Sequence, residues 1–132
     1  MSDARALIAR HNLVPHPEGG WFRETWRAAA GAGERSPGTA ILFLLDEGQS
    51  SHWHRVDADE LWFWHAGAAI ELRIGHETVT LDAGHPQALV PAGEWQAAKA
   101  QDGWALVSCV VVPGFDFAGF TLAPPGWEPS TA

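Results

Sequence analysis

Residues 48–67, GQSSHWHRVDADELWFWHAG, hold three of the seven histidines and three of the eight tryptophans of this chain. Side chains two residues apart on a β-strand point to the same face. We therefore predict that His52 and His54 project together, with Trp53 facing the other way. Two neighbouring imidazoles followed by Glu60 are typical of a site built from two histidines and one carboxylate.

The stretches around this segment are predicted to be short strands. The run 39–45, TAILFLL, is apolar throughout, as expected for a strand buried on both faces. Alternation or apolar runs also predict strands over 21–28, 50–56, 61–65, 68–74, 77–81, 88–91, 95–98, 104–112 and 115–122. Residues 3–11 are predicted to form one short helix with Ser2 or Asp3 as its cap. This pattern indicates an all-β, antiparallel fold, closed or double-sheeted, in a single domain spanning residues 1–132.

Composition narrows the possible partners. The chain is 46% hydrophobic and 18% charged, which is typical of a globular protein. A net charge of −8 with only eight Lys and Arg residues argues against binding to nucleic acid and to anionic membrane surfaces. No apolar run approaches the roughly 20 residues of a membrane span, and the N-terminus lacks the apolar core of a signal peptide. We therefore expect a soluble cytoplasmic protein, in which the single cysteine, Cys109, is a buried thiol.

Several motifs resemble those of the cupin superfamily. Gly48, His52, His54, Glu60 and Gly67 follow the order of the first cupin motif. The second motif is matched by the glycine at 84, the turn at 91–93 and the amide at Gln96. Four segments are similar, more narrowly, to the cupin branch formerly catalogued as a domain of unknown function, cupin type 5: HPEGGWFRET at 16–25, residues 54–60, VPAGEWQA at 90–97 and VPGFDF at 112–117.

The resemblance implies a cupin double-stranded β-helix, a jelly-roll barrel of two antiparallel sheets, with a short N-terminal helix. It also implies a pocket inside the barrel and a homodimer. Two positions depart from the motifs. Five residues separate His54 from Glu60, where three or four are usual, and Gln96 stands where a histidine is expected. An amide oxygen is a poorer ligand for a first-row metal than an imidazole.

The predicted metal site consists of His52, His54 and Glu60 around one divalent ion, Zn, Ni, Mn or Fe, with Gln96 beside it. In this interpretation His54 and Glu60 are the catalytic residues, and Glu60 is a general base if burial raises its pKa. In the alternative, the histidines hydrogen-bond a ligand without metal, or are structural. Glu60 would then pair with Arg55 in a turn.

The predicted ligand-binding residues are Arg23, Trp62, Trp64 and Gln96. Arg23 and Glu24 point to opposite faces of one strand, so at most one of them enters the pocket unless a bulge intervenes. Trp62 and Trp64 would line an aromatic pocket, or else belong to the core and the dimer interface. The predicted function is binding of a small polar or acidic metabolite, either by a metal-dependent isomerase, lyase or oxygenase or by a metal-free binding protein without catalytic activity.

Overall fold

The apolar run TAILFLL forms β3 (Thr39–Leu45), a strand that is covered on both faces. Phe43 and Leu45 pack into the main core, whereas Leu44 packs on the other face against Ala4 and Leu13. Ala4 lies on α1 (Ala4–His11), whose N-terminus is capped by the Asp3 side chain. The continuous apolar pattern of this segment follows from this double cover.

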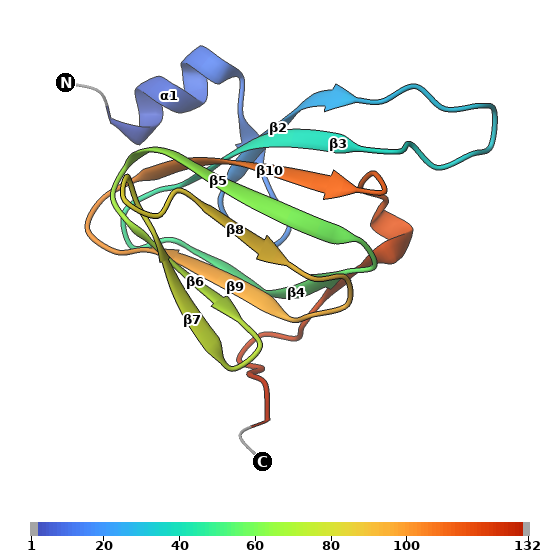
Figure 1. Cartoon of the computed structure of the whole chain (residues 1–132). Helices are drawn as coiled ribbons and strands as arrows, with labels where there is room; N and C mark the ends of the chain where they lie inside the picture. The colour runs from blue at the N-terminus through green and yellow to red at the C-terminus, as the bar shows by residue number, and fades with distance from the viewer. Residues whose placement is uncertain (1–2, 131–132) are drawn as a thin grey trace.

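The computed structural model describes residues 3–130 as two antiparallel sheets that face each other, with α1 on the outside (Figure 1). The six-stranded sheet has the order β1 (Val14–Pro15), β2 (Trp21–Arg27), β3, β10 (Ala105–Val112), β5 (Asp59–Gly67) and β8 (Gln87–Val90). The five-stranded sheet has the order β11 (Phe120–Leu122), β4 (Ser50–Val56), β9 (Gln96–Ala100), β6 (Ile70–Ile74) and β7 (Glu77–Leu81).

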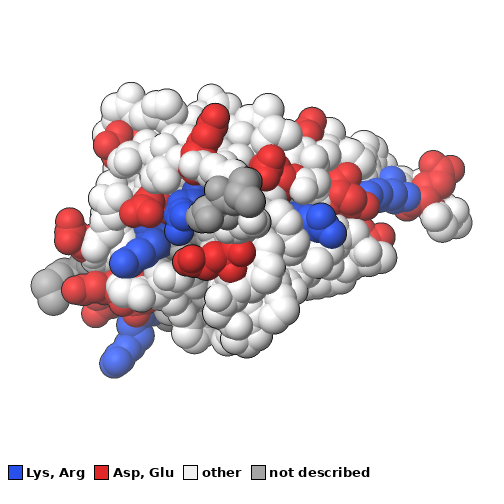
Figure 2. All heavy atoms as spheres, turned by 90° about the horizontal axis from the view of Figure 1, so that it is seen from below, with Lys and Arg blue, Asp and Glu red and all other residues white. Residues whose placement is uncertain are grey.

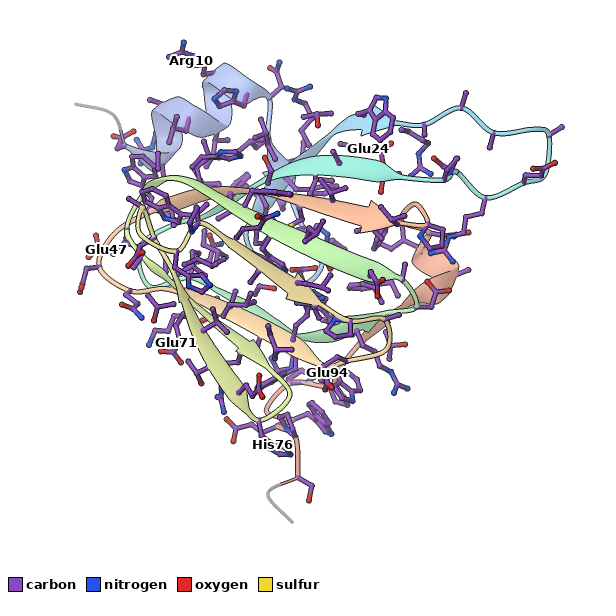
Figure 3. All side chains as sticks on the ribbon, viewed as in Figure 1. Arg10, Glu24, Glu47, Glu71, His76 and Glu94 are labelled. Carbon is purple, nitrogen blue, oxygen red and sulfur yellow. The ribbon has the colours of Figure 1, made fainter. Side chains whose placement is uncertain are left out.

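The main core lies between the two sheets, where side chains fill the space (Figure 3). Phe43 and Trp62 contribute from the six-stranded sheet, and Ile70, Leu72 and Ala98 contribute from the five-stranded sheet. Each of these five side chains is at most 3% exposed. The interior is therefore made jointly by both sheets, which is the double-sheet all-β architecture predicted from the sequence.

Most predicted elements are confirmed, and the exceptions lie near the ends of the chain. The predicted strand over 115–122 is wrong in its first half, where a 3-10 helix (Phe117–Gly119) precedes the short strand β11. The side chain of Asp116 caps that turn by accepting from the backbone N–H of Ala118. The sequence analysis also missed β1, a two-residue strand after the helix.

Acidic and basic side chains are interspersed on the underside of the molecule, and much of that surface is uncharged (Figure 2). No helix within residues 3–130 is both long and apolar enough to cross a membrane.

Candidate functional site

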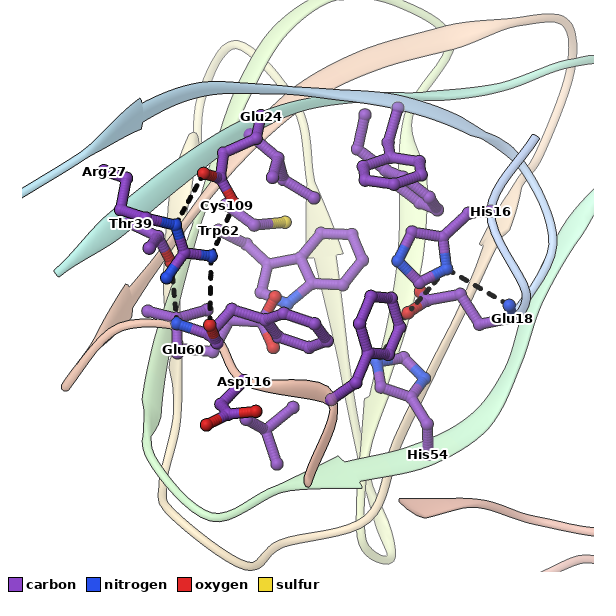
Figure 4. A pocket seen from close by; sticks show the side chains of 17 residues that line it. His16, Glu18, Glu24, Arg27, Thr39, His54, Glu60, Trp62, Cys109 and Asp116 are labelled. Atoms are coloured by element: carbon purple, nitrogen blue, oxygen red, sulfur yellow. Dashed lines mark hydrogen bonds and ion pairs between the residues drawn. The ribbon is translucent and has the colours of Figure 1, made fainter. Parts of the chain in front are cut away.

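A cavity of about 320 Å³ lies between the sheets and is lined by 17 residues (Figure 4). Much of its wall is aromatic, formed by Phe22, Phe43, Trp62, Phe115 and Phe117. Titratable side chains occupy separate parts of this wall. A concave, largely apolar cavity with a few convergent polar groups is the usual form of a small-molecule site.

The first polar group consists of His16, Glu18 and His54. The Oε1 atom of Glu18 lies 3.4 Å from Nδ1 of His16 and 3.4 Å from Nε2 of His54. The other carboxyl oxygen, Oε2, accepts a short hydrogen bond from the hydroxyl of Ser51. One buried carboxyl thus contacts two imidazoles and one hydroxyl.

Two glycines allow the loop that carries Glu18 to lie against β4. Gly19 and Gly20 have φ angles of 109° and 81°, a region that favours glycine. A Cβ atom on Gly19 would lie only 2.2 Å from the backbone oxygen of Ser50. The backbone N–H of His52 donates to the backbone oxygen of Glu18 at 2.7 Å. Close packing of the loop therefore depends on glycine and positions the Glu18 carboxyl beside His54.

Burial shifts the pKa values of this group toward uncharged forms. It raises the pKa of Glu18 from about 4.5 to about 8, although the hydrogen bond from Ser51 works in the other direction. Burial lowers the pKa of His16 to about 4, with a smaller contribution from His54. Burial also lowers the pKa of His54. At neutral pH we therefore describe Glu18 as a protonated acid between two neutral imidazoles, not as the anion of two ion pairs.

The hydrogen bonds of His54 define which ring nitrogen faces Glu18. Nδ1 of His54 lies 2.7 Å from the backbone oxygen of His52, an acceptor, so Nδ1 carries the proton in the neutral ring. Nε2 is then the unprotonated nitrogen, and it faces Glu18. The pair can share one proton between Glu18 Oε1 and His54 Nε2.

The second polar group is centred on Glu60, which is 7% exposed. Its Oε1 atom accepts from the Gln96 amide at 2.8 Å, and the Gln96 carbonyl oxygen accepts from the Trp62 indole at 2.9 Å. Burial raises the pKa of Glu60, while His54 lowers it and Glu18 raises it further. Cys109 contacts Glu60 through its thiol, whose pKa is raised well above its usual value by burial, so the thiol stays protonated.

The third polar group includes Glu24, Arg27 and Asp116. Arg27 donates to both carboxyl oxygens of Glu24 at 2.8 Å and to the backbone oxygen of Phe115 at 3.2 Å. Glu24 and Arg27 share the cavity because the pairing of β2 with β3 shifts register between Glu24 and Trp26. Strict alternation along β2 would place these two side chains on opposite faces.

The structure brings only some of the predicted site residues together. His54, Glu60 and Trp62 line the cavity, and Glu60 reaches it despite the longer turn. Gln96 lies behind Glu60, with its amide nitrogen and oxygen both bonded to protein groups. Trp64 packs against the core and donates to the backbone oxygen of Ala68 at 2.9 Å.

Arg23 and His52 lie outside the cavity. Nε of Arg23 donates to the backbone oxygen of His11 at 2.6 Å, on the outer side of β2. The β4–β9 pairing shifts register between Ser51 and His54, and His52 lines a different hollow instead of the barrel cavity. The predicted common face of His52 and His54 is therefore wrong, because strict alternation does not hold across a bulge.

These positions do not fit the predicted metal set. His52 is turned away from His54 and Glu60, and the Gln96 oxygen already accepts from Trp62. Among residues 3–130, no group of three or more His, Cys, Asp or Glu side chains has an arrangement that could hold a metal ion.

The sequence analysis missed His16 and Glu18 as site residues, and it missed Glu24, Arg27 and Asp116 as a group. A signal for the first two was present in His16-Pro17-Glu18-Gly19-Gly20. Two titratable residues beside consecutive glycines indicate a close backbone approach that places their side chains against another element. The sequence analysis used this segment as a turn and as part of the family motif at 16–25, without giving either residue a role in the site.

Comparison with known proteins identifies relatives over nearly the whole chain. The family model described as "Cupin superfamily (DUF985)" matches residues 5–123. No curated protein matches the chain. A crystal structure of protein SO0799 from Shewanella oneidensis is 39% identical, with a TM-score of 0.84, and covers 93% of this chain and 85% of that one. A hypothetical protein from Leishmania major is 32% identical, with a TM-score of 0.82, and covers 92% and 88%.

More distant structures share the fold. The DMSP lyase DddQ from Ruegeria pomeroyi is 20% identical, with a TM-score of 0.62, over 83% of this chain and 54% of that one.

Proposed function

Because the chain belongs to the cupin superfamily, in the branch described as DUF985, we propose that its barrel cavity binds a small polar molecule and catalyses proton transfer on it. The observation that carries this proposal is the contact between Glu18 and His54 in a cavity that also contains Glu60. Burying several titratable groups costs stability, so their convergence on one cavity favours a chemical role. The alternative is that these side chains form only a structural hydrogen-bond network within the core.

In the proposed reaction, Glu18 and His54 act as an acid–base pair. Glu18 keeps its proton at neutral pH, while the unprotonated Nε2 of His54 can accept one. A positioned acid–base pair contributes about 10²–10⁴-fold to rate. Glu60 is held in place by Gln96. It would bind or protonate the part of the substrate that lies away from Glu18 and His54. Removal of a proton next to a carbonyl would begin an isomerisation if the proton returns at another position. It would begin a lyase reaction if a leaving group departs from the neighbouring carbon instead.

The charges around the cavity favour a ligand that is neutral or carries a positive group. Glu18 is uncharged at neutral pH, and Arg27 is already paired with Glu24. Asp116 adds a carboxylate that accepts from the backbone N–H of Ala118 and forms no ion pair within residues 3–130. Among the described residues that line the cavity, no unpaired cation could hold an anionic ligand. The sequence predicted a polar or acidic metabolite, and we now propose an uncharged carbonyl or hydroxyl compound instead.

The test is exchange of carbon-bound hydrogen in deuterated buffer. Candidates from a thermal-shift screen of uncharged hydroxy-carbonyl compounds would be incubated with the protein and followed by proton NMR. We expect exchange with the wild type and loss of most of it in Glu18→Gln and His54→Ala. Glu47→Gln, an exposed change outside the cavity, is the matched control (Figure 3). Exchange that survives both cavity variants would contradict the proposal.

A binding protein without catalysis is the second candidate, and the aromatic wall of five rings favours it. If the protein only binds, some ligands should raise the melting temperature of the wild type but not that of Trp62→Ala. None of these ligands should then exchange carbon-bound hydrogen for deuterium.

We also propose that the protein is a homodimer, as the resemblance implies, and that it lies in the cytoplasm, as the composition predicts. Trp26, Val112 and Phe117 are 55%, 51% and 57% exposed, and Trp26 and Val112 lie together beside Gly38. Large apolar side chains exposed in one region are typical of an interface. Light scattering should give twice the 14.3 kDa chain mass in wild type and a smaller mass in Trp26→Glu.

A further inference from the structure

The outer face of the five-stranded sheet holds a second hollow, of about 340 Å³. It lies at the β4 bulge, and its side chains include Ser50, His52 and Trp53 from β4. The strand β6 shows that this is the side away from the barrel interior. Leu72 is fully buried in the core, so its neighbours Glu71 and Arg73, which line the hollow, point the other way.

Two cationic side chains in this hollow have no anionic partner within residues 3–130. The guanidinium of Arg73 is held over the Trp53 ring, with Cζ 5.0 Å from its centroid, and none of its N–H groups donates a hydrogen bond to an acceptor within residues 3–130. Lys99, the only lysine of the chain, has no ion pair or hydrogen bond in the described part of the structure. A stacked arginine is a pre-oriented donor, since its ring contact leaves the edge of the guanidinium free.

Neutral hydrogen-bonding groups surround these two cations. Nε2 of His52 is bonded to the backbone oxygen of Pro124 at 2.9 Å, which fixes the ring at the edge of the hollow. The Ser50 hydroxyl lies on the next exposed position of β4. The hollow therefore combines two cations with at least one hydroxyl and one oriented imidazole.

Glu71 limits the kind of ligand that fits. It lies opposite Lys99 in the β6–β9 register, although the two are not within the 4.0 Å of an ion pair. Two cations and one carboxylate leave an excess of one positive charge, in a chain whose net charge is −8. This balance suits a small oxyanion and disfavours a polyanion such as nucleic acid.

We propose that this hollow binds the oxyanion group, carboxylate or phosphoryl, of a small molecule, as a site separate from the barrel cavity. Arg73 would contribute two parallel N–H donors and Lys99 a point charge, with Ser50 as a neutral donor. The alternative is a solvated sheet face on which the charged side chains only keep the protein soluble.

The experiment is a titration of the ¹⁵N-labelled full chain with inorganic phosphate and, separately, with acetate, at constant ionic strength and neutral pH. Signals of the eight tryptophan indoles can be resolved in a ¹H–¹⁵N spectrum, and Trp53→Phe assigns the one beneath Arg73. We expect a saturable shift of the Trp53 indole, with about a fivefold or greater loss of affinity in Arg73→Gln and in Lys99→Gln.

Arg10→Gln is the matched control, because Arg10 lies on α1, on the other side of the molecule from Glu71 (Figure 3). Saturation with phosphate but not acetate identifies a phosphoryl site, and the reverse identifies a carboxylate site. A shift that rises linearly without saturation, or that is equal in the double variant Arg73→Gln/Lys99→Gln, would overturn the proposal. Loss of proton transfer in the barrel cavity would not affect this result.

Discussion

At the scale of single residues, Glu18 is the side chain whose chemistry is most changed by its surroundings. Its pKa is raised to about 8 by burial, whereas an unfolded chain would release the proton near 4.5. Between these values the folded protein binds one more proton than the unfolded chain, so its stability falls as pH rises. His16, with its pKa lowered to about 4, has the opposite effect below pH 6.5.

His16 contributes mainly below pH 6.5, so from pH 6.5 to pH 8 the Glu18→Gln variant separates the contribution of Glu18 from that of Glu60, whose pKa is also raised by burial. We expect the free energy of unfolding to fall by about 2 kcal/mol over this range in wild type, and to fall much less in Glu18→Gln. Glutamine keeps the shape of the side chain and does not titrate. Urea denaturation at several pH values measures the slope, with Glu47→Gln as the control for an exposed change. A slope in Glu18→Gln as steep as in wild type would show that another group carries it.

Gln96 was predicted to belong to the site as a ligand, and it does lie beside Glu60, but as a structural hydrogen-bonding group. The motif pointed to a ligand, but its amide joins the Trp62 indole to Glu60. Gln96→Leu would leave a buried N–H and a buried carboxyl oxygen without partners, at a cost of about 2–4 kcal/mol. Gln87→Leu, on an exposed position of β8, should cost far less.

Chemical denaturation of both glutamine variants tests this role. Removing both partners of a buried hydrogen bond destabilises a protein less than leaving one partner unsatisfied. The loss of unfolding free energy in Gln96→Leu/Glu60→Leu should therefore be smaller than the sum of the losses in the two single variants. If Gln96→Leu unfolds at the same denaturant concentration as Gln87→Leu, the buried hydrogen bonds contribute nothing.

At the scale of elements, the predicted pattern of strands was mostly right and the facing of side chains was partly wrong. The apolar runs of β3 and β10 identify strands directly, because burial determines residue type. Bulges leave no such pattern in the sequence. The shifts in β2 and β4 depend on tertiary pairing, and they moved Arg27 into the cavity wall and His52 out of it.

The β4 bulge gives a prediction about metal. Since His52 faces the outer hollow, His52→Ala should contain as much metal as wild type, both as purified without chelator and after titration with Zn²⁺. Plasma mass spectrometry measures the content, and His54→Ala is the comparison inside the cavity. A selective loss of Zn²⁺ in His52→Ala would restore the site predicted from the HxH pair.

The loop before β2 gives a second prediction, with a matched pair of glycines. Gly19 and Gly33 both have positive φ, 109° and 76°, but a Cβ on Gly33 would meet nothing within 4 Å. Gly33→Ala should cost only the backbone strain of about 1–2 kcal/mol. Gly19→Ala adds a clash with β4 and should cost clearly more, because the loop must move.

Thermal unfolding of the two alanine variants compares these costs. Displacement of the loop should also release Glu18 from His54, so Gly19→Ala is expected to lose part of the pH slope described above. Equal costs for Gly19→Ala and Gly33→Ala would mean that the loop is not held tightly against Ser50.

At the scale of the whole molecule, the two sheets depend on each other for their buried faces. Phe43 and Trp62 of one sheet share a single core with Ile70 and Leu72 of the other, and all four are at most 1% exposed. Separating the sheets would expose both apolar faces at once, at roughly 25 cal/mol for each Å² of apolar surface. The main core is therefore lost if either sheet is lost, and the six-stranded sheet would keep only the small cluster around Leu44 beneath α1.

We accordingly predict that the 132-residue chain unfolds as one domain in a single transition. Tryptophan fluorescence follows both sheets, since Trp62 lies on β5 and Trp53 on β4, while circular dichroism follows the backbone. The two signals should give the same midpoint in urea. A Leu72→Ala substitution in the five-stranded sheet should lower both midpoints equally, by about 2–5 kcal/mol in stability. Two separated midpoints, with only one of them moved by Leu72→Ala, would show that the sheets fold independently and that the cavity between them is not part of one cooperative unit.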